Sequence, residues 1–82
     1  MSEVDFIDIF SGNLNSLLKD TLMSPGELAE ASGLGRSTIS RYLSGKMMPS
    51  VRAIVNLSIA LDCEIDQLIP IYDLINWYSG FA

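Results

Sequence analysis

The sequence predicts an all-α domain of five helices. Apolar residues recur at spacings of three and four, which is the period of an α-helix. Ser, Gly and Pro stand where these periodic segments begin and end, as helix caps and stop signals do. No segment alternates apolar and polar residues between turns, so no sheet is expected.

Residues 4–22 form the first predicted helix. Gly12 lies within it and weakens its middle by roughly 1 kcal/mol, so we expect the segment before Gly12 to fray or kink. The buried stripe of this helix is expected to consist of Phe6, Phe10, Leu14, Leu17, Leu18 and Leu22.

A short second helix follows. Ser24 is expected to cap it, with Pro25 at its first position and Glu27 completing a capping box. The helix continues through Leu28, Ala29 and Ala31, and it ends at Gly33, which can take the left-handed C′ conformation.

The third helix is predicted from about residue 36 to residue 43. Gly45 is the next candidate for the C′ position, and Pro49 stops any continuation. The inner stripe of this helix is expected to be Ile39, Tyr42 and Leu43.

Two more helices complete the prediction. Ser50 caps a fourth helix that residues 62–64 break, and a last helix begins near Ile65 and continues to about Tyr78. Pro70 falls in the first turns of that last helix and is expected to split it. The apolar residues of the fourth helix are Val51, Ile54, Val55, Leu57, Ile59, Ala60 and Leu61, and those of the last are Leu68, Ile69, Ile71, Leu74, Ile75, Trp77 and Tyr78.

Length and composition limit the possible classes of protein. The 82 residues are expected to form one domain, 1–82, and the 49% of apolar residues argues against disorder. No apolar run reaches the roughly 20 residues that cross a bilayer, and no secretory signal opens the chain. The single Cys63 excludes an internal disulfide and is typical of a reducing cytoplasm. Because the chain also lacks His, neither a metal site nor another cofactor is expected.

The net charge of −5 conceals an uneven distribution of charge. Residues 1–30 carry six acids and one base, and residues 62–82 carry four acids and no base. Residues 31–61 carry four bases and no acid, and a local field of this kind steers a polyanion onto a surface. These bases are Arg36, Arg41, Lys46 and Arg52.

Two short helices joined by a tight turn, the second of them basic, describe a helix-turn-helix. Residues 28–46 read LAEASGLGRSTISRYLSGK, with Pro49 and Ser50 after them. This stretch resembles the phage repressor and Cro family, the XRE-type helix-turn-helix, and the resemblance covers about residues 14–69. It implies a five-helix bundle of the phage-repressor DNA-binding type, with the second and third helices as the helix-turn-helix.

The residues of the motif also have direct physical reasons. The small Ala29 lets two helices cross closely, and Gly33 permits a turn with positive φ. Leu34 and Ile39 attach the third helix to the core. A helix of this width fits the major groove of B-DNA, where residues near its N-terminus reach base edges. The residues left on its outer side and start are Arg36, Ser37, Thr38, Ser40 and Arg41.

The expected contacts follow from side-chain chemistry. Arg36 and Arg41 can each donate a fork to guanine, whereas Ser37, Thr38 and Ser40 can bond to bases or phosphates. The resemblance implies a phosphate contact for Lys46 in the turn after the helix. Arg52 is a weaker phosphate candidate, and Ser24 with the free amides at the start of its helix can bind another phosphate. The alternative is that these residues only make a helix face soluble.

Three departures from the family pattern concern phosphate contacts. Pro25 stands where the family often has Gln, Gly35 stands where a Ser or Thr usually caps the third helix, and residues 11–18 carry no charge. Fewer phosphate contacts weaken binding and lower its salt dependence. We therefore expect modest affinity per domain and a specificity that depends on pairing two domains.

Residues 70–82 form an apolar C-terminal extension whose composition is typical of an interface. We expect a two-fold dimer, and with it a two-fold DNA site. The alternatives are that the tail covers the domain's own core, or that the apolar start of the chain at Val4, Phe6, Ile7, Ile9 and Phe10 forms the contact. The predicted dimer residues are Ile71, Leu74, Ile75, Trp77 and Tyr78.

The leading interpretation is a transcriptional regulator, most simply a repressor, that binds double-stranded DNA as a homodimer. The alternative from another class is a protein-interaction module that uses the helix-turn-helix as a scaffold, which the acidic flanks and apolar tail favour. An enzyme is not expected, because no His and no glycine-rich phosphate loop is present and Cys63 has no base beside it. No small-molecule ligand and no membrane contact are evident.

Overall fold

The computed structural model describes residues 3–70, and within that range it contains five helices and no strand. The expected all-α, five-helix architecture is confirmed. The helices are α1 (Glu3–Thr21), α2 (Pro25–Ser32), α3 (Arg36–Leu43), α4 (Val51–Ala60) and α5 (Ile65–Leu68).

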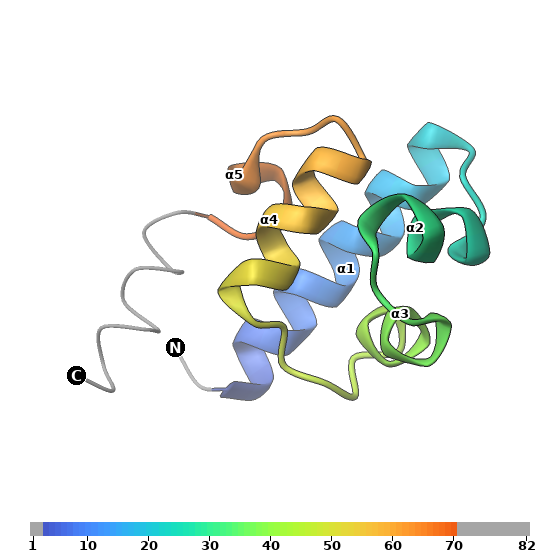
Figure 1. The fold of residues 1–82 in the computed structure, drawn as a ribbon. Coiled ribbons are helices and arrows are strands. Elements are labelled where there is room, and N and C mark those ends of the chain that lie inside the picture. Colours follow the sequence, from blue (N-terminus) through green and yellow to red (C-terminus); the bar gives the residue numbers. More distant parts are fainter. Residues whose placement is uncertain (1–2, 71–82) are drawn as a thin grey trace.

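The arrangement of the helices leaves one of them at the edge of the bundle. Helix α2 packs on α3 and α4, α1 packs on α3 and α5, and α4 packs on α5. Figure 1 shows the long α1 crossing behind the other helices, with α3 seen nearly end-on at the lower right. Among residues 3–70, helix α3 packs mainly on α1 and α2, and its polar side chains Arg36, Ser37, Ser40 and Arg41 are exposed.

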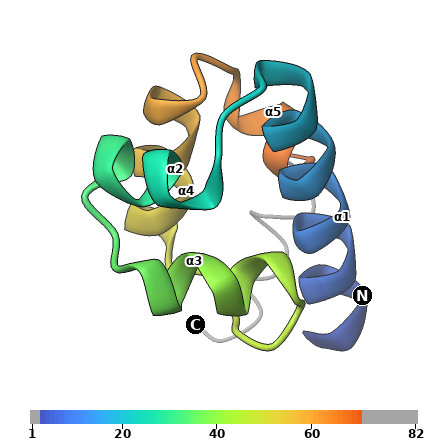
Figure 2. The same cartoon turned by 90° about the vertical axis from the view of Figure 1, so that its right-hand side faces the viewer.

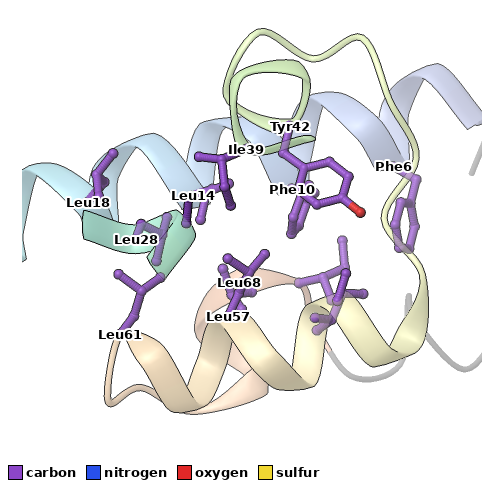
Figure 3. Packing of buried hydrophobic residues seen from close by; sticks show 14 residues of the cluster. Phe6, Phe10, Leu14, Leu18, Leu28, Ile39, Tyr42, Leu57, Leu61 and Leu68 are labelled. Atoms are coloured by element: carbon purple, nitrogen blue, oxygen red, sulfur yellow. The ribbon is translucent and has the colours of Figure 1, made fainter. Parts of the chain in front are cut away.

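The core consists of side chains that α1 and α4 direct toward each other, with α2, α3 and α5 closing the sides (Figure 3). Phe10 and Tyr42 meet edge to face with ring centroids 5.5 Å apart, a preferred aromatic geometry that fastens α3 to α1. The buried apolar residues are Phe6, Phe10, Leu14, Leu18, Leu28, Ala29, Ile39, Tyr42, Ala53, Ile54, Leu57, Leu61, Leu68 and Ile69.

Helix α1 departs from the sequence prediction at its end. It is continuous from Glu3 through Gly12, so the segment before Gly12 is helical. Leu22, expected in the buried stripe, is 91% exposed and has a left-handed φ of 57°. The stripe therefore ends at Leu18, because the chain leaves the helix after Thr21 and turns the next side chain into solvent.

The predicted caps are present at α2 and α4. The Ser24 hydroxyl accepts from the Glu27 amide, and the Glu27 carboxylate accepts from the Ser24 amide, so the capping box is complete. Gly33 ends α2 in the left-handed conformation, with φ of 73°. The Ser50 hydroxyl accepts from the Ala53 amide at the start of α4.

Helix α5 begins at Ile65, as predicted, and it ends just before Pro70, where the sequence indicated a split. Helix α5 ends at Leu68, and Ile69 is extended, with φ of −149° and ψ of 133°. The physical reason is Pro70, whose ring clashes with a helical conformation of the residue before it. Ile69 is instead buried in the core. Residues 71–78, where the prediction continued the helix, lie outside the described residues.

Part of the apolar start of the chain is used by the domain's own core. Phe6 and Phe10 are fully buried in the domain's own core, and only Val4 is largely exposed. Helix α4, in contrast, exposes three apolar side chains at intervals of four residues, which places them in one row. These are Val51, Val55 and Ile59, of which Ile59 is 72% exposed.

Candidate nucleic-acid interface

Helix α3 has two different faces. Ile39 and Tyr42 are buried against the rest of the domain, as expected. Arg36, Ser37, Ser40 and Arg41 are exposed, and Thr38 is half-buried. Figure 2 shows α3 along the lower edge of the molecule, with α2 above it and α1 at one end. The predicted polar side of α3 therefore faces solvent and is free to enter a groove.

The cations of the predicted interface are available for a ligand. Arg36, Arg41, Lys46 and Arg52 are all exposed, and none of them forms an ion pair with another residue in the range 3–70. Because no acid lies in residues 31–61, no carboxylate of that segment neutralises them. A surface with unpaired positive charge attracts a polyanion through its local field although the chain as a whole is acidic.

The C-terminal end of α3 is held by a Schellman motif. Gly45 has a left-handed φ of 71°, and its amide donates to the Tyr42 carbonyl at 3.2 Å. The Lys46 amide donates to the Arg41 carbonyl at 2.9 Å. This second bond fixes the backbone of Lys46. The side chain that is predicted to contact a phosphate therefore extends from a rigid turn.

Two neutral side chains of α1 complete this end of α3, and sequence reasoning missed both. The Schellman motif leaves the carbonyl of Leu43 without a backbone partner. Ser11 Oγ donates to that oxygen at 2.9 Å and Asn15 Nδ2 donates to it at 2.8 Å. The uncharged segment 11–18 therefore positions α3 instead of contacting DNA through charge. A polar stripe beside the apolar one on α1 was the only available signal.

The backbone amides at the start of α3 have fewer hydrogen-bond acceptors than those at the start of α2. Gly35 is the N-cap of α3 and has no side chain, so the first amides of α3 receive no side-chain hydrogen bond. At α2 the capping box occupies the amides of Ser24 and Glu27. The sequence had offered the α2 amides to a phosphate, and the box leaves the Gly26 amide and the Ser24 hydroxyl hydrogen for that contact.

Arg52 is the second residue of α4 and is exposed. It follows the buried Pro49 and the Ser50 cap, which together set the direction in which α4 begins. The structure thus places a base on each side of the α3–α4 turn, Arg41 before it and Arg52 after it, with Lys46 inside it.

The chemistry of the described residues does not favour a nucleophile or a metal ligand set. Burial raises the pKa of the Cys63 thiol, and the neighbouring carboxylates Glu64 and Asp62 raise it further, so the thiol stays protonated near neutral pH. Burial also raises the pKa of the Tyr42 phenol, although a backbone hydrogen bond from Ser50 opposes the shift. Within residues 3–70 no cluster of three potential ligands is arranged to hold a metal ion.

A family model described as helix-turn-helix matches residues 16–68. This chain belongs to the helix-turn-helix family. A solved structure with the same fold is the restriction-modification controller protein C.AhdI from Aeromonas hydrophila. It is 32% identical, has a TM-score of 0.74, and its match covers 77% of this chain and 96% of C.AhdI. None of the curated proteins matches this chain.

These matches confirm the family resemblance and the fold that the sequence indicated. The helix-turn-helix chain is a DNA-binding regulator of transcription, as its motif predicted. No helix among the described residues is both long enough and apolar enough to span a membrane.

Proposed function

We propose that helix α3 of this regulator binds the major groove of double-stranded DNA and reads its bases with Arg36 and Arg41. The observation that carries this proposal is the open side of α3, where exposed arginines and serines stand opposite the buried Ile39 and Tyr42. Both guanidinium groups are free of ion pairs with described residues. Arginine donates two hydrogen bonds to the O6 and N7 atoms of guanine, and each such pair contributes about 1–3 kcal/mol of discrimination.

The remaining contacts are proposed to position the domain on the phosphate backbone. Lys46 leaves from the rigid turn after α3, and Arg52 and Ser24 begin neighbouring helices. Ser37, Thr38 and Ser40 lie between the two arginines in the sequence and are proposed to bond to bases or phosphates, with the half-buried Thr38 the most restricted of them. Phosphate contacts carry little sequence information but fix the register of the reading helix.

Selection of bound duplexes from a random library tests the proposal. We expect the wild-type chain to enrich a defined sequence, and Arg36→Ala and Arg41→Ala each to relax the preference at separate base positions. A uniform loss of affinity without relaxed positions would identify phosphate contacts instead. Failure of the wild type to retain any duplex at low salt would favour the alternative of a protein-interaction module.

The chain is further proposed to act as a homodimer on a two-fold site and to repress transcription by occupying it. One domain offers few phosphate contacts, because Pro25 and the uncharged segment 11–18 supply none. A two-fold pair doubles the reading surface and matches two half-sites about one helical turn apart. The apolar row Val51, Val55 and Ile59 is a surface that a second copy would cover, together with the predicted residues 71–78 outside the described range. The chain is proposed to act in the cytoplasm, where it would reach DNA.

A further inference from the structure

Arg36 lies against α2, although it belongs to α3. A Cβ atom at position 26 would be 3.3 Å from Nη2 of Arg36, 3.4 Å from its Cζ and 3.6 Å from its Nε. Three atoms of one planar group at nearly equal distances mean that the guanidinium lies flat across Gly26 and does not point at it with one edge. The side chain thus bridges the first turns of both helices of the helix-turn-helix.

The backbone at position 26 does not itself require glycine. The glycines with positive φ are Gly33 and Gly45, whereas Gly26 has an ordinary helical place within α2. Glycine inside a helix lowers stability by roughly 0.5–1 kcal/mol relative to alanine. Glycine at position 26 therefore does not help the backbone of α2. It leaves free the space that a side chain would occupy, and the guanidinium of Arg36 lies in that space.

We propose that Gly26 is a positioning residue for Arg36. The absence of a Cβ atom lets the guanidinium rest on the first turn of α2, so Arg36 already has one preferred direction before DNA arrives. A side chain ordered in advance loses less conformational freedom on binding. The inference rests on the proposed function, because the direction of Arg36 matters only if α3 enters a groove.

A graded series at position 26 tests this role. Gly26→Ala forces the guanidinium to shift by a few tenths of an ångström. Gly26→Leu fills the space in which the guanidinium lies. On the duplex that the wild type selects from a random library, we expect affinity to fall about threefold for alanine and about tenfold or more for leucine. Preference should relax at the base positions that Arg36→Ala relaxes. The melting temperature should not fall, because both residues favour the helix more than glycine does.

Two controls separate positioning from a general effect. Gly12→Ala is the matched substitution, since a Cβ atom there meets nothing within 4 Å, and it should leave DNA affinity unchanged. In an Arg36→Ala background, the Gly26 variants should cause no further loss. In the free wild type, a nuclear Overhauser effect between the Gly26 Hα protons and the Arg36 side chain should be visible, and it should vanish in Gly26→Leu.

The outcomes that overturn the inference are distinct from those that overturn the proposed function. If the wild type selects a duplex but the Gly26 variants bind it equally well, Gly26 does not position Arg36. The same conclusion follows if the loss persists without Arg36 or if the Overhauser effect is absent. If the wild type retains no duplex at all, the proposed function fails, and this inference fails with it.

Discussion

Asn15 Nδ2 donates a hydrogen bond of 2.8 Å to the carbonyl oxygen of Leu43, across 28 positions of sequence. The same amide also donates to the Ser11 carbonyl at 2.9 Å within α1, which holds the side chain in place. Leu43 is the last residue of α3 and the one whose carbonyl the following turn leaves open. The orientation of the proposed reading helix therefore depends on a neutral side chain of a different helix.

Asn15→Ala is expected to weaken DNA binding more than its effect on folding explains. The loss of a hydrogen bond of this kind lowers the free energy of unfolding by about 1 kcal/mol. Since the bond also sets the tilt of α3, we expect a severalfold loss of affinity at temperatures where the variant is fully folded. Fluorescence anisotropy with a selected duplex and urea denaturation measure the two effects.

Asn13→Ala is the matched control for that substitution. Asn13 Nδ2 donates at 2.7 Å to the Leu68 carbonyl at the end of α5, away from α3. We expect a similar loss of stability but unchanged DNA affinity. Equal losses of affinity in the two variants would show that the Asn15 bond has no special effect on α3.

Lys46→Ala is expected to reduce the salt dependence of DNA binding. Each phosphate contact contributes about one unit to the slope of log K against log salt, so the slope should become shallower by about 1. Lys19→Ala serves as the control, because Lys19 belongs to the last turn of α1, at the end of that helix remote from α3 in Figure 2. An identical slope for Lys46→Ala and the wild type would remove Lys46 from the interface.

Glycine-to-alanine substitutions at positions 12 and 33 should have opposite effects on stability. Gly33 has a φ of 73°, and a Cβ atom in this conformation costs about 1–2 kcal/mol although no neighbouring atom lies within 4 Å. Gly12 lies in the interior of α1 with equal space around it, so alanine there should stabilise by roughly 0.5–1 kcal/mol. Urea midpoints of the two variants test this, and a shift in the same direction for both would contradict it.

Cys63 is expected to react slowly with iodoacetamide at pH 7.5. Its folded-state pKa lies above the ordinary thiol value, because burial and the carboxylates of Glu64 and Asp62 disfavour the thiolate. The raised pKa contributes to the stability of the fold, and this contribution is fully present at pH values below the pKa of the unfolded thiol. It is lost as the pH rises through the pKa of the folded thiol. The alkylation rate should therefore rise at higher pH than for the urea-unfolded chain. Coincident pH profiles for both states would exclude the shift.

The proposed dimer predicts a concentration-dependent sedimentation coefficient. Trp77→Ala and Leu74→Ala alter the predicted contact in residues 70–82, and Ile59→Asp introduces a charge into the exposed row of α4. Each should shift the equilibrium toward monomer, and at concentrations where the wild type is already monomeric the melting temperature should be unchanged. A wild-type chain that remains monomeric at about 100 μM would reject dimerisation through either surface.

Local signals account for what sequence reasoning predicted well. Ser24 with Glu27, Gly33 and Ser50 mark helix ends through hydrogen bonds or backbone angles that involve only three or four neighbouring residues. Such signals act whatever the rest of the chain does. The basic segment 31–61 is also a local feature of the sequence. So is the apolar period of α3, which decides the side chains that are buried and therefore the polar side chains that remain exposed.

Contacts between distant segments account for what sequence reasoning missed. Ser11 and Asn15 read as ordinary polar residues of a helix surface until α3 is placed beside them. Arg36 was expected on the outer side and start of α3, and its contact with Gly26 depends on how closely α2 and α3 cross. Leu22 continued the apolar period in the sequence, but the chain leaves the helix before it.

The sequence by itself determined the helical class, the ends of α2 through α4, and the family to which the chain belongs, because caps, glycine turns and apolar periods are properties of adjacent residues. Only the tertiary structure decided how α3 is held and where Arg36 lies, because these depend on the packing of α1 and α2 around it. A hydrogen bond or a van der Waals contact between distant segments has no local signature, and it exists only after the core has brought those segments together.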